Sequence, residues 1–346
     1  MPRNNDDDRA KAMIETNKSL KSYNTFGIES IARYFFTVNH VEELQVILSH
    51  AKEKNTHPLM LGGGSNILLT KDFDGLVLHN KIMGIEKINE DAEHVYLKVG
   101  AGENWHQFVL YCIEQHYAGI ENLSLIPGTV GAAPIQNIGA YGVEIKDTIF
   151  EVHTISMDDQ SVQVFTNHAC DFNYRDSIFK RTLKNKLVIT HVIFRLNKTP
   201  AFQIDYGSIK QKLKGEDISI KIISDAIIQL RQEKLPNPAL IGNAGSFFKN
   251  PIVSEDIFLN MQKKYSSMPY FKEKDDRIKI PAAWLIEQCG FKGKRFGDVG
   301  IHANQALVLV NYGNGSGEQI KQLSTTIQTA VKETFVIDLV TEVHII

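Results

Sequence analysis

The chain has 346 residues, which is more than one hydrophobic core usually serves, so two or three packed units are expected. Its 38 basic and 40 acidic residues give a formal net charge of -2, which offers no electrostatic reason to expect nucleic acid or an anionic membrane as a partner. The polar leading segment, residues 1–21, lacks the apolar run of a signal peptide, and no stretch of about 20 apolar residues follows, so a cytoplasmic protein is expected. Three scattered cysteines predict buried thiols rather than a disulfide framework: Cys112, Cys170 and Cys289.

Short strands and two helices are expected in the first part of the chain. Strands are predicted at 57–61, 67–69, 75–80 and 94–99. Asn39 is expected to cap a helix whose apolar face is formed by Val41, Leu44, Ile47, Leu48 and Ala51. Asn104 is expected to cap a second helix, which presents Trp105, Phe108, Val109, Cys112, Ile113 and His116 on one face.

The later part of the chain predicts a sheet, a boundary and then further helices and strands. Residues 149–196 read as mainly extended, in a mixed sheet, and a helix at 224–233 stops before Pro236 and Pro238, where a new unit is expected. Pro281 can sit in the first turn of a helix that ends at Gly290, and 306–311 reads as a strand. A last helix, with Ile320, Leu323, Ile327 and Val331 on one face, precedes a strand-like end at 339–346.

Two glycine-rich segments are candidates for ligand binding. GGGSN, residues 62–66, has no lysine followed by Ser or Thr and leads into an extended run, so neither a Walker loop nor a dinucleotide-binding turn fits. Its glycines still let the backbone approach a phosphate closely, although a tight strand connection is the alternative. The small residues of PGTVGAAPIQNIGAYG, residues 127–142, suggest backbone lying against a large planar or phosphorylated ligand, with a merely tortuous loop as the alternative.

Three polar residues in separate motifs are the catalytic candidates. They are Arg175 in NYRDSIFK, Ser246 in GNAGSFFKNP and Glu342 in LVTEVHII. A cation, a hydroxyl and a carboxylate are what a protein needs to stabilise an enolate beside a carboxylate and to protonate its carbon. Taken singly, each has an ordinary reading, as a surface ion-pair partner, a turn residue and an edge-strand residue respectively.

These five motifs, in this order from about Asn24-Thr25-Phe26-Gly27 to the last residue, resemble those of the UDP-N-acetylenolpyruvoylglucosamine reductase family. The resemblance implies an α+β protein: a two-lobed FAD-binding fold of the vanillyl-alcohol-oxidase (PCMH) type with a smaller α/β substrate-binding domain. The lobes are expected at 1–86 and 87–235 and the substrate-binding domain at 236–335, with a closing strand at 336–346 that can pack back on the second lobe.

The resemblance also implies an activity, that of a UDP-N-acetylmuramate dehydrogenase. Such an enzyme uses NADPH and non-covalent FAD to reduce UDP-N-acetylglucosamine enolpyruvate to UDP-N-acetylmuramate, a step of peptidoglycan precursor synthesis. The expected partners are these small molecules, with no nucleic acid and no membrane, and a monomer is the expected state. The histidines show no metal-ligand spacing, so no metal is expected.

Residue roles follow from the same resemblance. Arg175 would pair with the developing dianion of the enolpyruvyl carboxylate, Ser246 would donate a proton to carbon 2, and Glu342 would act beside Arg175 as a protonated or proton-sharing group. The positions implied for the cofactor are Gly62, Gly63, Gly64, Ser65, Asn66, Pro127, Gly128, Gly131, Ala132, Asn137, Gly139, Ala140 and Tyr141. Those implied for the substrate or its diphosphate are Tyr174, Tyr206, Lys234, Asn250, Lys292 and Gln305.

Tyr206 in FQIDYGS resembles the tyrosine of the type I branch, on a loop that folds over the UDP group. The chain departs from the family pattern at Ala132-Ala133 and over 254–279, which looks inserted or divergent. An FAD-dependent oxidase of the same fold is one alternative, although residues 62–66 hold no histidine or cysteine for a covalent flavin. A non-catalytic nucleotide-sugar sensor is the other alternative. Such a sensor would tolerate loss of the three catalytic candidates, yet this chain has all three.

Overall fold

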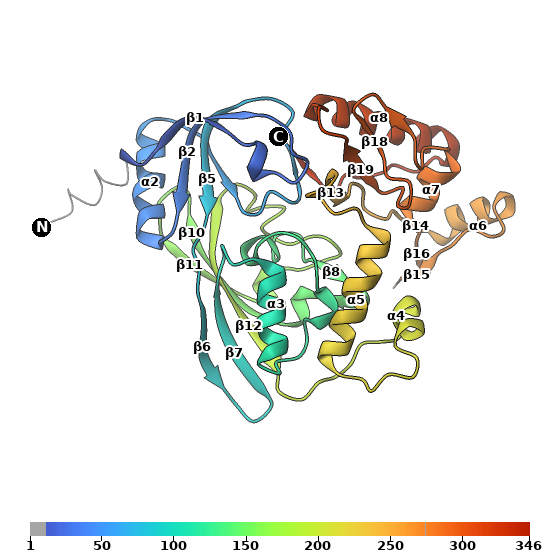
Figure 1. Ribbon diagram of the computed structural model, residues 1–346, viewed down its shortest axis with the longest axis horizontal. Helices are drawn as coiled ribbons and strands as arrows, with labels where there is room; N and C mark the ends of the chain where they lie inside the picture. The colour runs from blue at the N-terminus through green and yellow to red at the C-terminus, as the bar shows by residue number, and fades with distance from the viewer. Residues whose placement is uncertain (1–11, 274) are drawn as a thin grey trace, which may run out of the picture. The chain divides into compact units, whose positions relative to one another are not determined.

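The computed structural model describes residues 12–273 and 275–346, so the first eleven residues of the predicted polar lead lie outside the described residues. The described chain forms two compact units (Figure 1). The first contains residues 12–18, 31–63 and 73–233, and the second contains 19–30, 64–72 and 234–346. The change of unit at Glu233 and Lys234 lies close to the predicted boundary after residue 235.

A four-stranded sheet with one helix begins the first unit. Its order is β1-β2-β5-β3, in which β5 runs parallel to both β2 and β3. Its strands are β1 (Glu15–Ser19), β2 (Ile31–Val38), β3 (Pro58–Leu61) and β5 (Phe73–Asn80). Helix α2 (Val41–Glu53) buries Leu44, Ile47, Leu48 and Ala51, which confirms most of the predicted apolar face.

The predicted cap of α2 was wrong by one residue. His40, in an extended conformation, is the N-cap. The Glu43 carboxylate accepts a 2.9 Å hydrogen bond from the Asn39 backbone N–H, so Asn39 belongs to the approach to the helix. Asn39 turns its own side chain back to the carbonyl of Thr37, at 3.4 Å.

A five-stranded sheet follows, in the order β11-β10-β12-β7-β6. Every pairing in it is antiparallel, so the prediction of a mixed sheet was wrong. Tight turns join β6 to β7 and β10 to β11, and such hairpins necessarily produce antiparallel neighbours. Its strands are β6 (Ile85–Glu90), β7 (His94–Gly100), β10 (Ile149–Ser156), β11 (Val162–Thr166) and β12 (Leu187–Asn197).

Helix α3 (Trp105–Glu114) packs its apolar face on this sheet. The Asn104 side chain accepts a 3.0 Å hydrogen bond from the backbone N–H of Gln107, so the predicted cap is confirmed. His116 was wrongly placed on the buried face, because the helix ends before it and it is exposed, with a φ of 59°.

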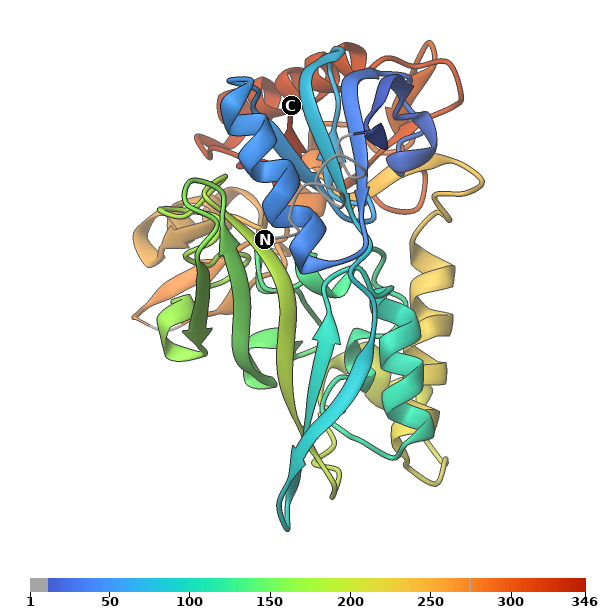
Figure 2. The ribbon, with the colours of Figure 1, turned by 90° about the vertical axis from the view of Figure 1, so that its left-hand side faces the viewer.

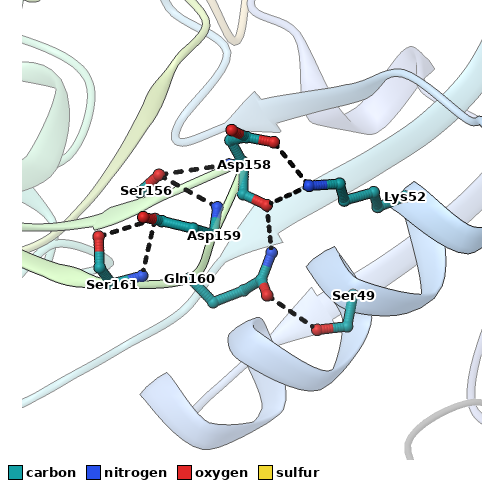
Figure 3. Close-up of polar contacts among 7 residues, drawn as sticks. All are labelled: Ser49, Lys52, Ser156, Asp158, Asp159, Gln160 and Ser161. Atoms are coloured by element: carbon teal, nitrogen blue, oxygen red, sulfur yellow. Dashed lines mark hydrogen bonds and ion pairs between the residues drawn. The ribbon is translucent and has the colours of Figure 1, made fainter.

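The β10–β11 turn docks on α2 and joins the two predicted FAD lobes in one compact unit (Figure 3). Lys52 Nζ donates to the Asp158 carboxylate at 2.7 Å and to the Asp158 carbonyl at 2.9 Å. Ser49 Oγ contacts Gln160 Oε1 at 3.2 Å. Beneath these contacts, Ile155 of β10 and Val188 of β12 are buried in the same apolar cluster as the core face of α2.

Two further helices complete the first unit. Helix α5 (Ile220–Lys234) begins four residues before the predicted 224 and lies beside α3 (Figures 1 and 2). Helix α4 (Gly207–Lys212) is short, and Ile209 and Leu213 form a buried cluster with Ile223 and Ile227 of α5. A small hairpin of β8 (Gly139–Ala140) and β9 (Val143–Glu144) ends the second glycine-rich segment.

The second unit is built on the antiparallel sheet β13-β19-β18-β17. Its strands are β13 (Gly242–Ser246), β17 (Arg295–Phe296), β18 (Val299–Ile301) and β19 (Val308–Asn311). Helices α7 (Ala282–Gln288) and α8 (Gly317–Phe335) share its hydrophobic core. The four residues predicted for the face of the last helix are all buried.

The segment that looked divergent has a defined structure in the second unit. It contributes α6 (Glu255–Lys264) and, with β14 (Ile252–Ser254), the three-stranded sheet β14-β16-β15. Strands β15 and β16 span Phe271–Lys272 and Arg277–Lys279. Phe258 and Met261 of α6 are buried in the core of this unit.

The closing strand differs from the prediction in length and in partner. It is reduced to β20 (His344–Ile345), which pairs in parallel with β4 (Ile67–Leu68). Because β4 follows the first glycine-rich segment, the end of the chain pairs with a strand of the predicted first lobe, directly after that segment. Among the described residues, no helix combines the length and apolarity needed to cross a membrane.

Candidate functional site

The first glycine-rich segment meets the second within the first unit. A Cβ atom added at Gly62 would lie 2.5 Å from Thr129 Oγ1, and one added at Gly63 would lie 3.0 Å from Gly128 Cα. Both distances are too short for ordinary side-chain packing, and at Gly63 the neighbouring atom belongs to the backbone, whereas at Gly62 the Thr129 hydroxyl would have to move. The two segments predicted to bind a common ligand therefore approach each other backbone to backbone.

Gly64 makes the turn that follows, within the second unit. Its φ is 61°, and a Cβ atom there would overlap the carbonyl oxygen of Tyr23. Its carbonyl accepts a 3.1 Å hydrogen bond from the N–H of Thr25. Within the described part of the chain, the backbone N–H groups of Gly64 and Ser65 donate to no other group, and unused amides in a glycine turn suit a phosphate.

Arg175 lies against the second glycine-rich segment. Its Nη2 donates to the carbonyl of Gly139, and its Nη1 lies 3.5 Å from the carbonyl of Asn137. Arg175 has a φ of 52°, in a turn closed by hydrogen bonds between Asn173 and Asp176. The structure thus brings a predicted catalytic residue to predicted cofactor-binding residues.

Two side chains hold this turn in place. Ser177 Oγ donates to the carbonyl of Ile135 at 2.6 Å. Asn137 is fully buried and donates from Nδ2 to the Asn173 carbonyl at 3.0 Å, while its Oδ1 accepts from the N–H of Lys146 at 3.1 Å. The side-chain amide of Asn137 is therefore used to hold the turn.

Tyr141 and Tyr206 meet edge to face, with ring centroids 5.7 Å apart and an interplanar angle of 82°. Asn122 is buried and donates to the carbonyls of both Tyr141 and Gln203, at 3.1 and 2.8 Å. Tyr206 remains 47% exposed. The structure therefore ties the end of the second glycine-rich segment to the loop predicted to cover the UDP group.

Ser246 and Glu342 are neighbours in the second unit. The backbone N–H of Glu342 donates to the carbonyl of Phe247, and Phe248 forms a bridge with Thr341. Asn66 joins the same cluster, since its Nδ2 donates to the Glu342 carbonyl at 3.2 Å and its own carbonyl accepts from the N–H of His344 at 3.0 Å. Two catalytic candidates and one cofactor candidate are therefore assembled there, whereas Arg175 belongs to the first unit.

The other predicted substrate residues have varied surroundings. Tyr174 lies under the guanidinium of Arg175, 5.4 Å from ring centroid to Cζ. Lys234 is the exposed last residue of α5, and Lys292 pairs with Glu287 at 2.8 Å. The remaining two accept hydrogen bonds from backbone N–H groups: Asn250 Oδ1 accepts from Ala282 at 2.9 Å, and Gln305 Oε1 accepts from Leu307 at 3.3 Å.

Arg231 is a candidate that the sequence analysis missed. Burial, followed by the nearby charge of Arg175, lowers the pKa of Arg231, while Tyr141 acts in the opposite sense. Its Nε donates to the carbonyl of Leu125 at 3.3 Å. The available signal was its spacing from Ser224 and Ile227, both buried on the same face of α5.

These residues fit FAD. Backbone amides of the first segment would hold phosphate, and the closely packed glycines leave backbone rather than side chains to line the ligand. Residues 32–164 match a family model described as an FAD binding domain. Residues 237–346 match a model described as the C-terminal domain of UDP-N-acetylenolpyruvoylglucosamine reductase.

Curated relatives match nearly the whole chain. It is 50% identical over 337 residues to the UDP-N-acetylenolpyruvoylglucosamine reductase of Flavobacterium johnsoniae, covering 96% of this chain and 99% of that protein. It is 51% identical over 336 residues to the enzyme of the same name from Amoebophilus asiaticus, with coverage of 96% and 99%.

A solved structure supports the fold. The crystal structure of the reductase from Thermus caldophilus superposes with a TM-score of 0.65 at 22% identity, covering 96% of this chain and 97% of that one. The expected α+β FAD-binding fold with a distinct C-terminal domain is thereby confirmed. The chain belongs to the UDP-N-acetylenolpyruvoylglucosamine reductase family and is a flavin-dependent oxidoreductase.

Proposed function

We propose that this chain reduces UDP-N-acetylglucosamine enolpyruvate to UDP-N-acetylmuramate, with NADPH as the hydride donor and non-covalently bound FAD. The observation that carries the proposal is the attachment of Arg175 to the backbone of the second glycine-rich segment. It puts a guanidinium, suited to a carboxylate, against residues suited to a flavin.

When bound, FAD supplies a two-electron carrier between NADPH and carbon 3 of the enolpyruvyl group. The chain contributes charge and positioning. Arg175 is proposed to pair with the substrate carboxylate, which gains negative charge as the hydride arrives. The partly buried Arg231 adds a second positive charge close to Arg175, and this concentration of charge favours a dianionic ligand.

Proton delivery is assigned to the second unit. Ser246 is proposed to donate its hydroxyl proton to carbon 2, and Glu342, in protonated or proton-sharing form, to support the carboxylate side of the intermediate. The backbone ladder between the two segments supports these roles, because it fixes both residues without using their side chains. The residues proposed to hold the UDP-sugar are Tyr174, Tyr206, Lys234, Asn250, Lys292 and Gln305.

The biological setting belongs to the same proposal: a cytoplasmic monomer that acts on small molecules in peptidoglycan precursor synthesis. The test is steady-state kinetics with anaerobic spectroscopy. NADPH should bleach the bound flavin without the UDP-sugar, and double-reciprocal plots should show parallel lines, because nicotinamide must leave before the enolpyruvyl group enters. Intersecting lines, with a stable complex of both ligands, would contradict this order.

A further inference from the structure

The entry to the second glycine-rich segment is held by side chains from two helices of the first unit. Trp105 Nε1 of α3 donates to the carbonyl of Leu123 at 2.9 Å. Ser224 Oγ of α5 lies 2.7 Å from Ser124 Oγ, a hydrogen-bonding distance. Residues 123–125 are thus fixed immediately before Pro127 and Gly128, where the predicted cofactor contacts begin.

Leu125 is the strained residue of this entry. Its φ is 59°, in the left-handed region that a residue with a branched side chain adopts only when its surroundings impose it. Its backbone N–H donates to His106 Nδ1 at 3.0 Å, and its carbonyl accepts from Arg231 Nε at 3.3 Å. Both polar groups of one strained residue are therefore bound, one by each helix.

We propose that His106 and Arg231 are positioning residues for FAD, acting through Leu125, whose left-handed conformation aims the second glycine-rich segment at the cofactor. The inference rests on the proposed function only in taking FAD as the ligand of that segment. Neither side chain needs to touch the cofactor. Removing the contact to Leu125 lets residues 125–128 relax to a commoner conformation, so the pocket must be re-formed when the cofactor binds.

The protonation state of His106 supports this role. Because Nδ1 accepts a hydrogen bond, the neutral ring carries its proton on Nε2, and a proton on Nδ1 would abolish the contact. Burial, followed by the charge of Arg231, lowers the pKa of His106, which favours the neutral acceptor.

Two polar substitutions separate positioning from simple packing. In His106→Asn, the side-chain oxygen can occupy the place of Nδ1 and accept from Leu125, whereas in His106→Gln the amide lies near the place of Nε2. FAD affinity of the apoprotein is measured by quenching of flavin fluorescence, and apoprotein stability by urea unfolding. His116→Asn, a change at an exposed histidine, is the control.

We expect His106→Asn to bind FAD about as tightly as the parent and His106→Gln to bind about five- to tenfold more weakly, the loss expected for one hydrogen bond. Adding Leu125→Gly to His106→Gln should restore most of the affinity, because glycine adopts a positive φ without strain. Equal FAD affinities of the Asn and Gln variants, or no recovery on adding Leu125→Gly, would overturn the inference. A parent chain that binds no FAD would instead overturn the proposed function.

Discussion

The backbone N–H of Glu342 donates a 2.8 Å hydrogen bond to the carbonyl oxygen of Phe247, the residue after Ser246. This contact, with the bridge between Phe248 and Thr341, fixes the end of the chain against the strand that carries Ser246. Since backbone groups make both contacts, they do not depend on the identity of the Ser246 or Glu342 side chain.

Ser246→Ala should leave flavin reduction by NADPH nearly unchanged while turnover collapses. The variant removes the proposed proton donor for carbon 2, and a loss at or beyond the roughly 10²–10⁴-fold typical of general acids is expected. Ser246→Cys should retain more activity. The test is stopped-flow measurement of flavin reduction by NADPH and of flavin reoxidation by substrate. Ser254→Ala is the control, because Ser254 caps α6 without a side-chain hydrogen bond to the helix. Equal impairment of both half-reactions would mean that Ser246 shapes the loop.

Glu342→Gln should retain more turnover than Glu342→Ala. Glutamine keeps a neutral hydrogen-bonding group of the same size, which matches a carboxyl that acts in its protonated form. Rates of flavin reoxidation by substrate should fall in the order parent, Gln, Ala, while flavin reduction stays the same. If the Gln and Ala variants lose the same activity, proton sharing by Glu342 is not part of the mechanism.

Gly64→Ala should be far more damaging than Gly27→Ala. Both glycines have a positive φ, 61° and 65°, so both variants incur the left-handed cost of about 1–2 kcal/mol in the free energy of unfolding. A methyl group at Gly64 would also overlap the Tyr23 carbonyl, whereas nothing lies within 4 Å of one at Gly27. Urea unfolding and FAD titration of both variants measure the difference. Equal losses of stability and of FAD affinity would show that the backbone at Gly64 can shift to accommodate a methyl group.

The structure shows which features the sequence could reveal. The α3 cap was predictable because Asn104 and Gln107 are three residues apart, and apolar spacing located the core face of α8. The ladder between β4 and β20 was not predictable, because each strand contributes two residues and nothing local records their pairing.

Long-range packing also hid part of the candidate site. The motif around Arg175 was recognisable, but its contact with Gly139 depends on a turn 36 residues away in sequence. Arg231 lies in the polar run RQEK, which reads as a solvated helix end, and only its spacing from Ser224 and Ile227 indicated that it lies toward the buried face of α5. His106 similarly acquires its contact with Leu125 from the path of the chain after α3.

Tyr206→Phe should weaken UDP-sugar binding without slowing flavin reduction. Phenylalanine preserves the edge contact with Tyr141, so only the hydroxyl is lost, which corresponds to about 0.5–1.5 kcal/mol, or up to about 3 kcal/mol for a charged phosphate partner. Titration calorimetry with the UDP-sugar measures the loss, with Tyr34→Phe as the control. Normal binding with slow flavin reduction would assign Tyr206 to the flavin or nicotinamide side.

Two half-buried histidines should make the fold acid-sensitive. Burial lowers the pKa of both His79 and His191 to about 4, helped by Lys81 and by Lys98 and His153 respectively. The unfolded chain, with histidine pKa values of about 6.5, binds more protons between these values, so stability is full above pH 6.5 and falls as pH drops toward 4.

His191→Gln should reduce the loss of unfolding free energy on acidification by on the order of 1–2 kcal/mol, after allowance for solvent screening. Urea unfolding between pH 7 and about 4.5 tests it. His116→Asn serves as the exposed control and should keep the parent slope. A parental slope in His191→Gln would show that this histidine is not buried in its neutral form.

The most direct test of the proposed function is anaerobic reoxidation of the reduced enzyme. The purified chain with FAD is reduced by one equivalent of NADPH, freed of NADP and mixed with UDP-N-acetylglucosamine enolpyruvate, while flavin absorbance and product mass are followed. The proposed function predicts that the flavin is reoxidised with formation of one equivalent of UDP-N-acetylmuramate. A flavin that stays reduced in the presence of this substrate would contradict it.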